Sequence, residues 1–156
     1  MEEVSVSRCG IYCGACYIYR AERDCGDFIR EIADRQKVEL DQVKCNGCLA
    51  QVEEKWGNCR KCYPQSCLKE KGLEFCHQCD EFWNYSCEEY NKLETFCAKR
   101  GENIRQNLIK IMADTPRWID EQENKWRCGS CGEPYSWYEE SCHHCGKNLG
   151  RKDLEK

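Results

Sequence analysis

Apolar side chains recur at the 3.6-residue spacing of an amphipathic helix in several separate segments of the chain. The first segment spans residues 17–37, where Phe28 and Ile32 fall on one face and charged residues on the other. Gly26 interrupts this segment, and glycine weakens the interior of a helix. The pattern predicts two short helices that meet near Gly26.

The same spacing predicts further helices along the rest of the chain. Asp114, Thr115 and Pro116 separate the last two, with Thr115 expected as the N-cap and Pro116 at the first helical position. The predicted ranges are 66–71, 87–100, 102–113 and 117–124. The apolar faces of the last two helices need a partner, most simply each other.

The apolar content is too low for an ordinary hydrophobic core. Leu, Ile, Val and Phe make up 25 of the 156 residues, which is below the share found in well-cored domains. Disorder is not favoured, because the net charge is only −4 and the chain has 17 cysteines. A structural zinc ion contributes on the order of 10–16 kcal/mol of binding energy that is coupled to folding. The composition therefore predicts a fold held together by metal ions.

Eight cysteines crowd residues 45–87, and six of them form three C-x-x-C pairs. Two thiols at this spacing form a tight turn that presents both sulfurs to one tetrahedral ion. A disulfide framework is the alternative, but repeated C-x-x-C is poor disulfide spacing, and 17 cysteines cannot all pair. The predicted metal ligands in this stretch are Cys45, Cys48, Cys59, Cys62, Cys67, Cys76, Cys79 and Cys87.

A second cysteine motif, C-x3-C-x2-C, lies near the N-terminus and consists of Cys9, Cys13 and Cys16. Three thiols leave one tetrahedral position of a metal ion open unless a distant residue fills it. We expect a distant cysteine, or His77, to close the site, with Cys25 as one candidate. The open alternative is a site that bears a cluster or binds an exchangeable ligand.

The C-terminal region holds two C-x-x-C-G motifs, with ten residues between the last cysteine of the first and the first cysteine of the second. A glycine after the second cysteine allows the positive φ that turns backbone N–H groups toward the sulfurs. Facing hairpins that carry two such motifs form a zinc ribbon. The predicted ligands of this site are Cys128, Cys131, Cys142 and Cys145.

Four other cysteine and histidine residues are more readily explained by packing or exposure than by metal binding, although Cys25 also stays a candidate for the N-terminal site. Cys25 stands apart from the motifs and is expected to be a small buried apolar residue. Cys97 falls on the apolar face of the predicted helix 87–100. His143 and His144 lie inside a C-x-x-C motif, whose geometry predicts that they point outward to solvent.

The cysteine pattern resembles a known family. Residues 8–100 look like the Cys-rich prokaryotic family catalogued as domain of unknown function 3795. In this sequence Cys87 follows Trp83, Asn84, Tyr85 and Ser86, a longer gap than is usual in that family. The resemblance implies a metal-binding module and brings no established activity. The matching cysteines are Cys9, Cys13, Cys16, Cys45, Cys48, Cys59, Cys62, Cys67, Cys76 and Cys79, with Cys87 as an eleventh.

These observations predict a small α-rich α+β protein stapled by metal. Its predicted parts are a Cys-rich metal-binding domain at 1–100, a helical connector at 101–124, a zinc ribbon of β-hairpins at 125–150 and a charged tail at 151–156. Three sites of four thiols, and a fourth around the N-terminal motif, predict three to four metal ions. Zinc is expected, with an iron–sulfur cluster as the alternative.

The sequence favours an interaction or regulatory module over an enzyme. It has no glycine-rich phosphate loop, no G-x-S-x-G and no H-E-x-x-H, and no catalytic residue is assigned. Iron–sulfur or redox chemistry at the N-terminal cysteines and nucleic-acid binding by the ribbon are the alternatives. The negative charge opposes contact with phosphates, so another protein is the expected partner. No segment reaches the roughly 20 apolar residues of a membrane span, and the free thiols indicate the cytoplasm.

Overall fold

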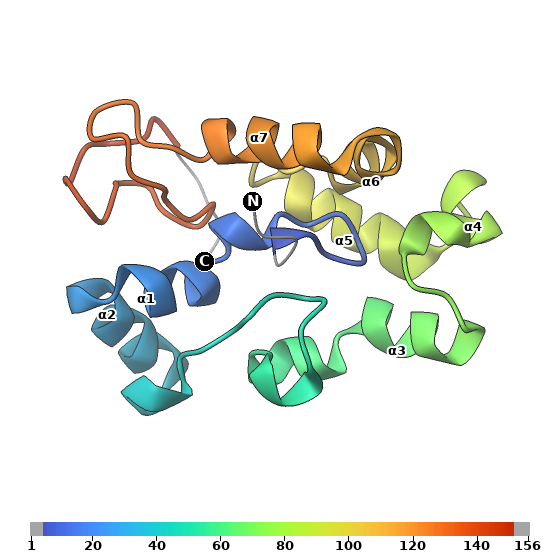
Figure 1. The fold of residues 1–156 in the computed structure, drawn as a ribbon, viewed down its shortest axis with the longest axis horizontal. Coiled ribbons are helices and arrows are strands. Elements are labelled where there is room, and N and C mark those ends of the chain that lie inside the picture. The colour runs from blue at the N-terminus through green and yellow to red at the C-terminus, as the bar shows by residue number, and fades with distance from the viewer. Residues whose placement is uncertain (1–4, 152–156) are drawn as a thin grey trace.

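The computed structural model describes residues 5–151, which are mostly helical (Figure 1). Short 3-10 turns connect the helices around the cysteine motifs. No helix in the described range is long and apolar enough to cross a membrane. The α-helices are α1 (Tyr17–Asp24), α2 (Gly26–Gln36), α3 (Tyr63–Lys71), α4 (Asp80–Trp83), α5 (Glu88–Ala98), α6 (Ile104–Ala113) and α7 (Thr115–Lys125).

The two helices predicted in residues 17–37 are present as α1 and α2. The break between them is sharp because Cys25 has a φ of 53° and Gly26 a φ of 61°. Cys25 is exposed, and its Sγ donates a hydrogen bond to the carbonyl oxygen of Glu22 at 3.1 Å. The prediction that Cys25 is buried is therefore wrong: it stands at the turn between two helices, where no apolar neighbour covers it.

The last two helices, α6 and α7, begin at side-chain caps. Asn103 caps α6 by accepting a hydrogen bond from the backbone of Gln106 at 3.0 Å. Asp114 caps α7 by accepting one from the backbone of Arg117 at 3.1 Å. The expectation that Thr115 is the N-cap of α7 is wrong. The Asp114 carboxylate accepts the hydrogen bond from the Arg117 backbone N–H, so the cap is one residue earlier in the chain.

The larger of two hydrophobic cores joins the N-terminal loop to the C-terminal half of the chain. It contains Tyr12 from the loop, Leu108 from α6, Trp118 from α7 and Trp137 from the C-terminal segment. Figure 1 shows the N-terminal loop (blue) at the centre of the molecule, below α7. The smaller core lies between α1 and α2 and includes Val43.

Polar contacts from α5 and α6 fix the backbone of the first cysteine motif. The Tyr90 hydroxyl donates to the carbonyl oxygen of Cys9 at 2.9 Å, and Asn107 Nδ2 donates to that of Gly10 at the same distance. All of these contacts are buried. Side chains about 80 to 100 positions later in the chain thus bind the backbone of the cysteine motif and fix its position.

The predicted β-hairpins of a zinc ribbon, and with them the α+β class, are wrong. Residues 5–151 contain no β-strand, only isolated antiparallel bridges, two of which pair Arg127 with Pro134 and Ser141 with Asn148. Pro134 has no N–H with which to extend a ladder. Beyond this bridge the backbone N–H of Trp137 donates to Ala15 in the N-terminal loop at 3.1 Å. The segment therefore pairs with itself only around these short bridges, and at Trp137 it bonds to the N-terminal loop instead.

Candidate metal centres

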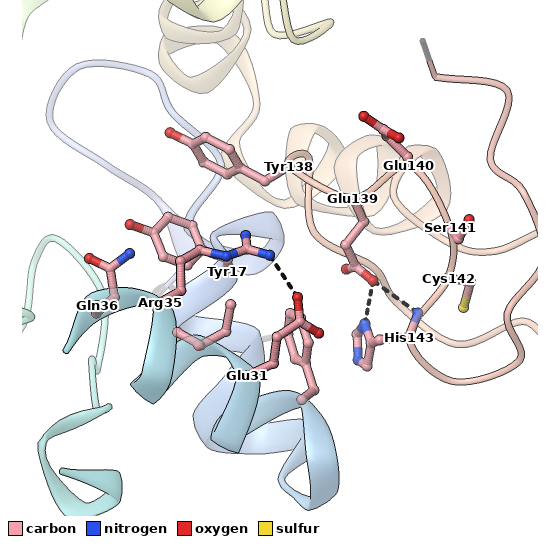
Figure 2. A pocket seen from close by; sticks show the side chains of 12 residues that line it. Tyr17, Glu31, Arg35, Gln36, Tyr138, Glu139, Glu140, Ser141, Cys142 and His143 are labelled. Carbon is pink, nitrogen blue, oxygen red and sulfur yellow. Dashed lines mark hydrogen bonds and ion pairs between the residues drawn. The ribbon is translucent and has the colours of Figure 1, made fainter. Parts of the chain in front are cut away.

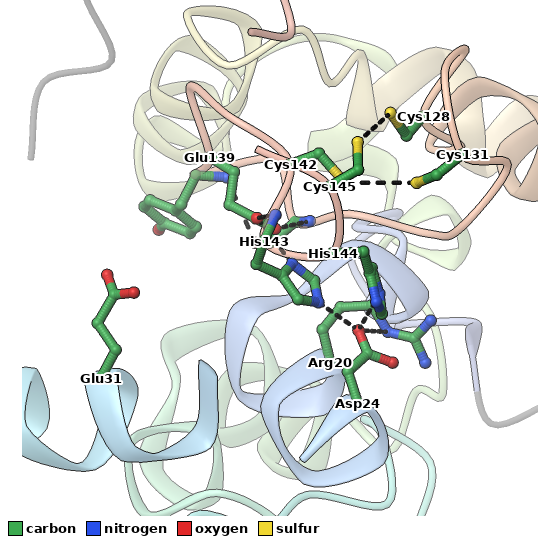
Figure 3. A network of polar contacts seen from close by, with 12 residues as sticks. Arg20, Asp24, Glu31, Cys128, Cys131, Glu139, Cys142, His143, His144 and Cys145 are labelled. Carbon is green, nitrogen blue, oxygen red and sulfur yellow. Dashed lines mark hydrogen bonds and ion pairs between the residues drawn. The ribbon is translucent and has the colours of Figure 1, made fainter. Parts of the chain in front are cut away.

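The four C-terminal cysteines form a compact group of thiols (Figure 3). Their sulfurs all lie within 4.8 Å of one another, with Cys128 Sγ 3.7 Å from Cys145 Sγ and Cys131 Sγ 3.8 Å from Cys142 Sγ. Four sulfurs placed about 2.3 Å from a central zinc ion in a tetrahedron are about 3.8 Å apart. Two of the sulfur–sulfur distances thus match those of a four-thiolate metal site, and the others lie within 4.8 Å. These residues could hold one metal ion.

Two matching turns build this site. In each, the residue after the second cysteine donates its N–H to the carbonyl oxygen of the first cysteine, Gly132 to Cys128 at 2.8 Å and Gly146 to Cys142 at 2.7 Å. Gly132 and Gly146 have φ values of 76° and 73°, as the sequence predicted. The bridges at Arg127 and Ser141 close the two turns. The local hydrogen bonding therefore brings both pairs of sulfurs to one point although no hairpin forms.

Electrostatic differences among these thiols follow from their surroundings. Backbone N–H groups of Cys131 and Ser130 donate to Cys128 and lower its pKa to about 7. Burial raises the pKa of Cys142 to about 12. A metal ligand must be a thiolate, so a cation in the site would take the place of the proton on Cys142. Metal binding here is expected to release protons.

A second group of four cysteines, Cys67, Cys76, Cys79 and Cys87, lines one small cavity of about 30 Å³. Cys67 comes from α3, Cys76 from the 3-10 turn before α4, and Cys87 is the N-cap of α5. Lys71 Nζ lies 3.3 Å from Cys79 Sγ, where it would offset thiolate charge. The cavity is large enough for a water molecule or an ion. The sequence could not show which of the central cysteines share a site, and the structure places these four around one cavity. Their role as metal ligands stays a prediction.

Electrostatic interactions connect the remaining predicted ligands, which come from the N-terminal motif and the first two central motifs, and we refer to these thiols as the third group. Burial and the neighbouring Cys48 thiolate raise the pKa of Cys9 to about 12, and the same two causes raise the pKa of Cys13. A hydrogen bond from Cys59 lowers the pKa of Cys45 to about 6. The members of this group are Cys9, Cys13, Cys16, Cys45, Cys48, Cys59 and Cys62.

The two candidates that the sequence offered by name for the fourth ligand of the N-terminal motif make other contacts in the structure. Cys25, one candidate from the sequence, bonds to the backbone of Glu22 at the surface. The ring of His77, the other candidate, stacks on Phe75 with the ring centres 5.5 Å apart. Cys97, which was expected in the core, is fully buried.

A polar group beside the C-terminal centre was missed by sequence reasoning (Figure 3). His143 Nε2 lies 2.8 Å from Asp24 Oδ2 and His143 Nδ1 lies 2.7 Å from Glu139 Oε1, and its side chain is only 10% exposed. Burial lowers the pKa of His143, but the bonds to Asp24 and Glu139 outweigh it and raise the pKa to about 9. The prediction of an outward His143 is wrong, whereas His144 is exposed as predicted.

A pocket of about 740 Å³ opens on the other side of this group, between α1, α2 and residues 138–143 (Figure 2). Glu139 and His143 form one wall, and the ion pair between Arg35 and Glu31, at 2.6 Å, lies on the facing helix. Tyr17 and Tyr138 also line the pocket, with their rings in edge contact. This pocket is separate from the four thiols, of which it touches Cys142 alone.

Comparison with known proteins places the N-terminal part of this architecture in a family. Residues 5–92 match the family described as "Protein of unknown function (DUF3795)", which covers the N-terminal loop, α1 to α4 and the start of α5. The C-terminal four-thiol group lies outside this match. No curated protein and no solved structure is significantly similar to the chain. Because the family model matches more than half of its residues, the chain belongs to the DUF3795 family.

Proposed function

We propose that this protein binds zinc in structural four-thiolate centres and works as a protein-interaction or regulatory module in the cytoplasm. The observation that carries the proposal is the spacing of the C-terminal sulfurs, 3.7 and 3.8 Å across the pairs Cys128–Cys145 and Cys131–Cys142. This is the spacing of sulfurs around a tetrahedral zinc ion, about 3.8 Å. Thiolate ligands select zinc among the common divalent metals of a reducing compartment.

A structural role for this centre is supported by its filled coordination. Four sulfurs occupy every position of a tetrahedral ion, so a substrate has none left to take. The loops around the site carry only isolated bridges. A zinc ion that contributes on the order of 10–16 kcal/mol would fix these loops more strongly than their hydrogen bonds do.

An interaction role is supported by large apolar side chains on the surface. Trp83 is 48% exposed, Tyr85 63% and Met112 53%. Aromatic residues and methionine are enriched where proteins meet. Each four-thiolate zinc centre also carries about −2 of net charge, which adds to the −4 of the chain. That charge favours a protein partner over nucleic acid.

The proposal is tested by metal analysis of protein purified anaerobically under reducing conditions. We expect three to four metal ions per chain, mostly zinc, and a colourless sample. One ion or none would contradict the proposal. Binding to a generic DNA duplex should be weak, and a binding constant that falls steeply with salt concentration would favour a nucleic-acid-binding regulator instead.

A second candidate, an iron–sulfur or redox function, is favoured by one observation. Seven thiols interact electrostatically around the N-terminal motif, whereas a single tetrahedral ion takes four. Iron–sulfur clusters are held by cysteine thiolates and absorb visible light, which zinc does not. A brown sample that bleaches on reduction, and loses its colour in Cys13→Ser, would support this function. A colourless sample with zinc in the same purification would exclude it.

A further inference from the structure

Three side chains beside the C-terminal centre converge without any thiol among them. Asp24 is the last residue of α1, while His143 and His144 lie between Cys142 and Cys145. Asp24 Oδ2 is 2.8 Å from His143 Nε2 and 3.4 Å from His144 Nε2, and the three ligand atoms all lie within 4.8 Å of one another (Figure 3). Two imidazoles and a carboxylate thus point at one place.

These spacings fit a metal ion. Ligand atoms about 2.05 Å from an ion are about 2.9 Å apart at a right angle and about 3.4 Å apart at the tetrahedral angle. The two measured spacings, 2.8 and 3.4 Å, correspond to these two values. We propose that Asp24, His143 and His144 bind a divalent transition-metal ion, separately from the thiolate centres. The chemistry of the ligands points to zinc, iron, nickel or copper.

The surrounding residues hold the central ligand in place. Glu139 Oε1 lies 2.7 Å from His143 Nδ1 and also accepts from the backbone N–H of His143 at 2.9 Å. Phe28 stacks on the His143 ring at 3.9 Å, with the planes 9° apart. A metal-binding histidine is typically oriented by such a carboxylate on its other nitrogen. The Nε2 atom of His143 is therefore fixed toward Asp24.

The charges that face the site are of both signs. The carboxylates of Asp24 and Glu139 would attract a metal cation. This attraction opposes the repulsion between the cation and the Arg20 guanidinium, whose Nε lies 4.0 Å from Asp24 Oδ2. Three protein ligands leave at least one position of the ion for water or a small ligand. This site would therefore exchange ligands, unlike the filled four-thiolate centre. It would also tie α1, within the family match, to the C-terminal segment outside it.

The test uses the full-length chain loaded with zinc in its thiolate sites, from which the zinc that a weak competing chelator can remove has been taken away, so that the proposed site starts empty. Cobalt(II) is then added anaerobically, and both the zinc released and the absorption of the bound cobalt are measured. We expect one further equivalent of cobalt to bind without release of zinc and without the near-ultraviolet charge-transfer band of a cobalt–thiolate bond. Imidazole added afterwards should change the cobalt spectrum, because it enters the open position.

His144→Ala is the informative variant, because His144 is exposed and its loss leaves the buried contacts of His143 intact. It should weaken the binding of the additional cobalt by at least about tenfold, the scale on which the loss of a supporting group alone weakens metal sites. His77→Ala, a histidine in another C-x-x-C motif, is the matched control and should bind cobalt as wild type does. Absence of the additional equivalent in wild type would overturn the proposal, and so would equal affinity in His144→Ala.

Discussion

Gly10→Ala should be far more damaging than its size suggests, because Gly10 lies where the cysteine loop touches α6. Its φ is +93°, in the region that L-residues rarely adopt. A Cβ at this position would overlap the backbone carbonyl oxygen of Ile104 and would lie 3.0 Å from Leu108 Cγ. The carbonyl oxygen belongs to the first turn of a helix, so it cannot move aside alone. The loop or the helix must shift.

The expected cost has three parts. The left-handed backbone costs about 1–2 kcal/mol for a residue with a Cβ. Overpacking against the start of α6 adds about 1–3 kcal/mol. A shift of the loop also weakens the buried hydrogen bond from Asn107 Nδ2 to the Gly10 carbonyl oxygen, 2.9 Å long, and an unsatisfied buried group costs about 1–3 kcal/mol. We therefore expect Gly10→Ala to lower the free energy of unfolding by roughly 3–8 kcal/mol.

Gly72→Ala provides the matched control. Gly72 ends α3 with a φ of 65°, and a Cβ there would meet nothing within 4 Å. Only the backbone strain applies, so the cost should be about 1–2 kcal/mol. Both variants are unfolded in urea at one fixed zinc concentration under reducing conditions, since bound metal shifts apparent stability. Equal losses in the two variants would refute the packing of the N-terminal loop against α6.

Two further predictions concern a buried ion pair and the metal. Arg105, whose side chain is 8% exposed, bonds Glu94 at 2.9–3.0 Å, so Arg105→Met should lower the free energy of unfolding by about 3–5 kcal/mol. Lys92→Met, which breaks an exposed pair with Glu89, should cost less than about 1 kcal/mol, and similar costs would contradict the burial of Arg105. A strong chelator should remove the metal and expose Trp137, which would shift the tryptophan fluorescence to longer wavelength. An unchanged emission spectrum after metal loss would show that the C-terminal loops do not depend on the metal.

The helices were predictable because their signals are local. The faces of Phe28 and Ile32, and of Ile104 and Leu108, repeat within one or two turns, and these residues are buried in the structure. The match of residues 5–92 likewise confirms the family that the cysteine spacing had indicated. The four C-terminal cysteines do form one compact group. These features depend on residues that are close in sequence.

The features that were missed depend on contacts between distant residues. Trp137 turns away from a hairpin partner because it packs in the larger core and bonds Ala15, which no local pattern shows. His143 is drawn inward by Asp24, 119 residues earlier in the chain. The grouping of Cys67 with Cys87 around one cavity is also a consequence of how α3 meets α5. The spacing of the cysteines identified these thiols as candidate ligands, but it could not show which of them share one site.

The central claim is that Cys128, Cys131, Cys142 and Cys145 hold one metal ion. The most direct test is the metal content of wild type, of Cys131→Ser and of Cys25→Ser, all purified anaerobically in parallel. Cys131 and Cys25 are both exposed, but only Cys131 belongs to the four-thiol group. Cys131→Ser should contain one metal equivalent less than wild type, and Cys25→Ser should match wild type. Equal metal content in wild type and Cys131→Ser would contradict the claim.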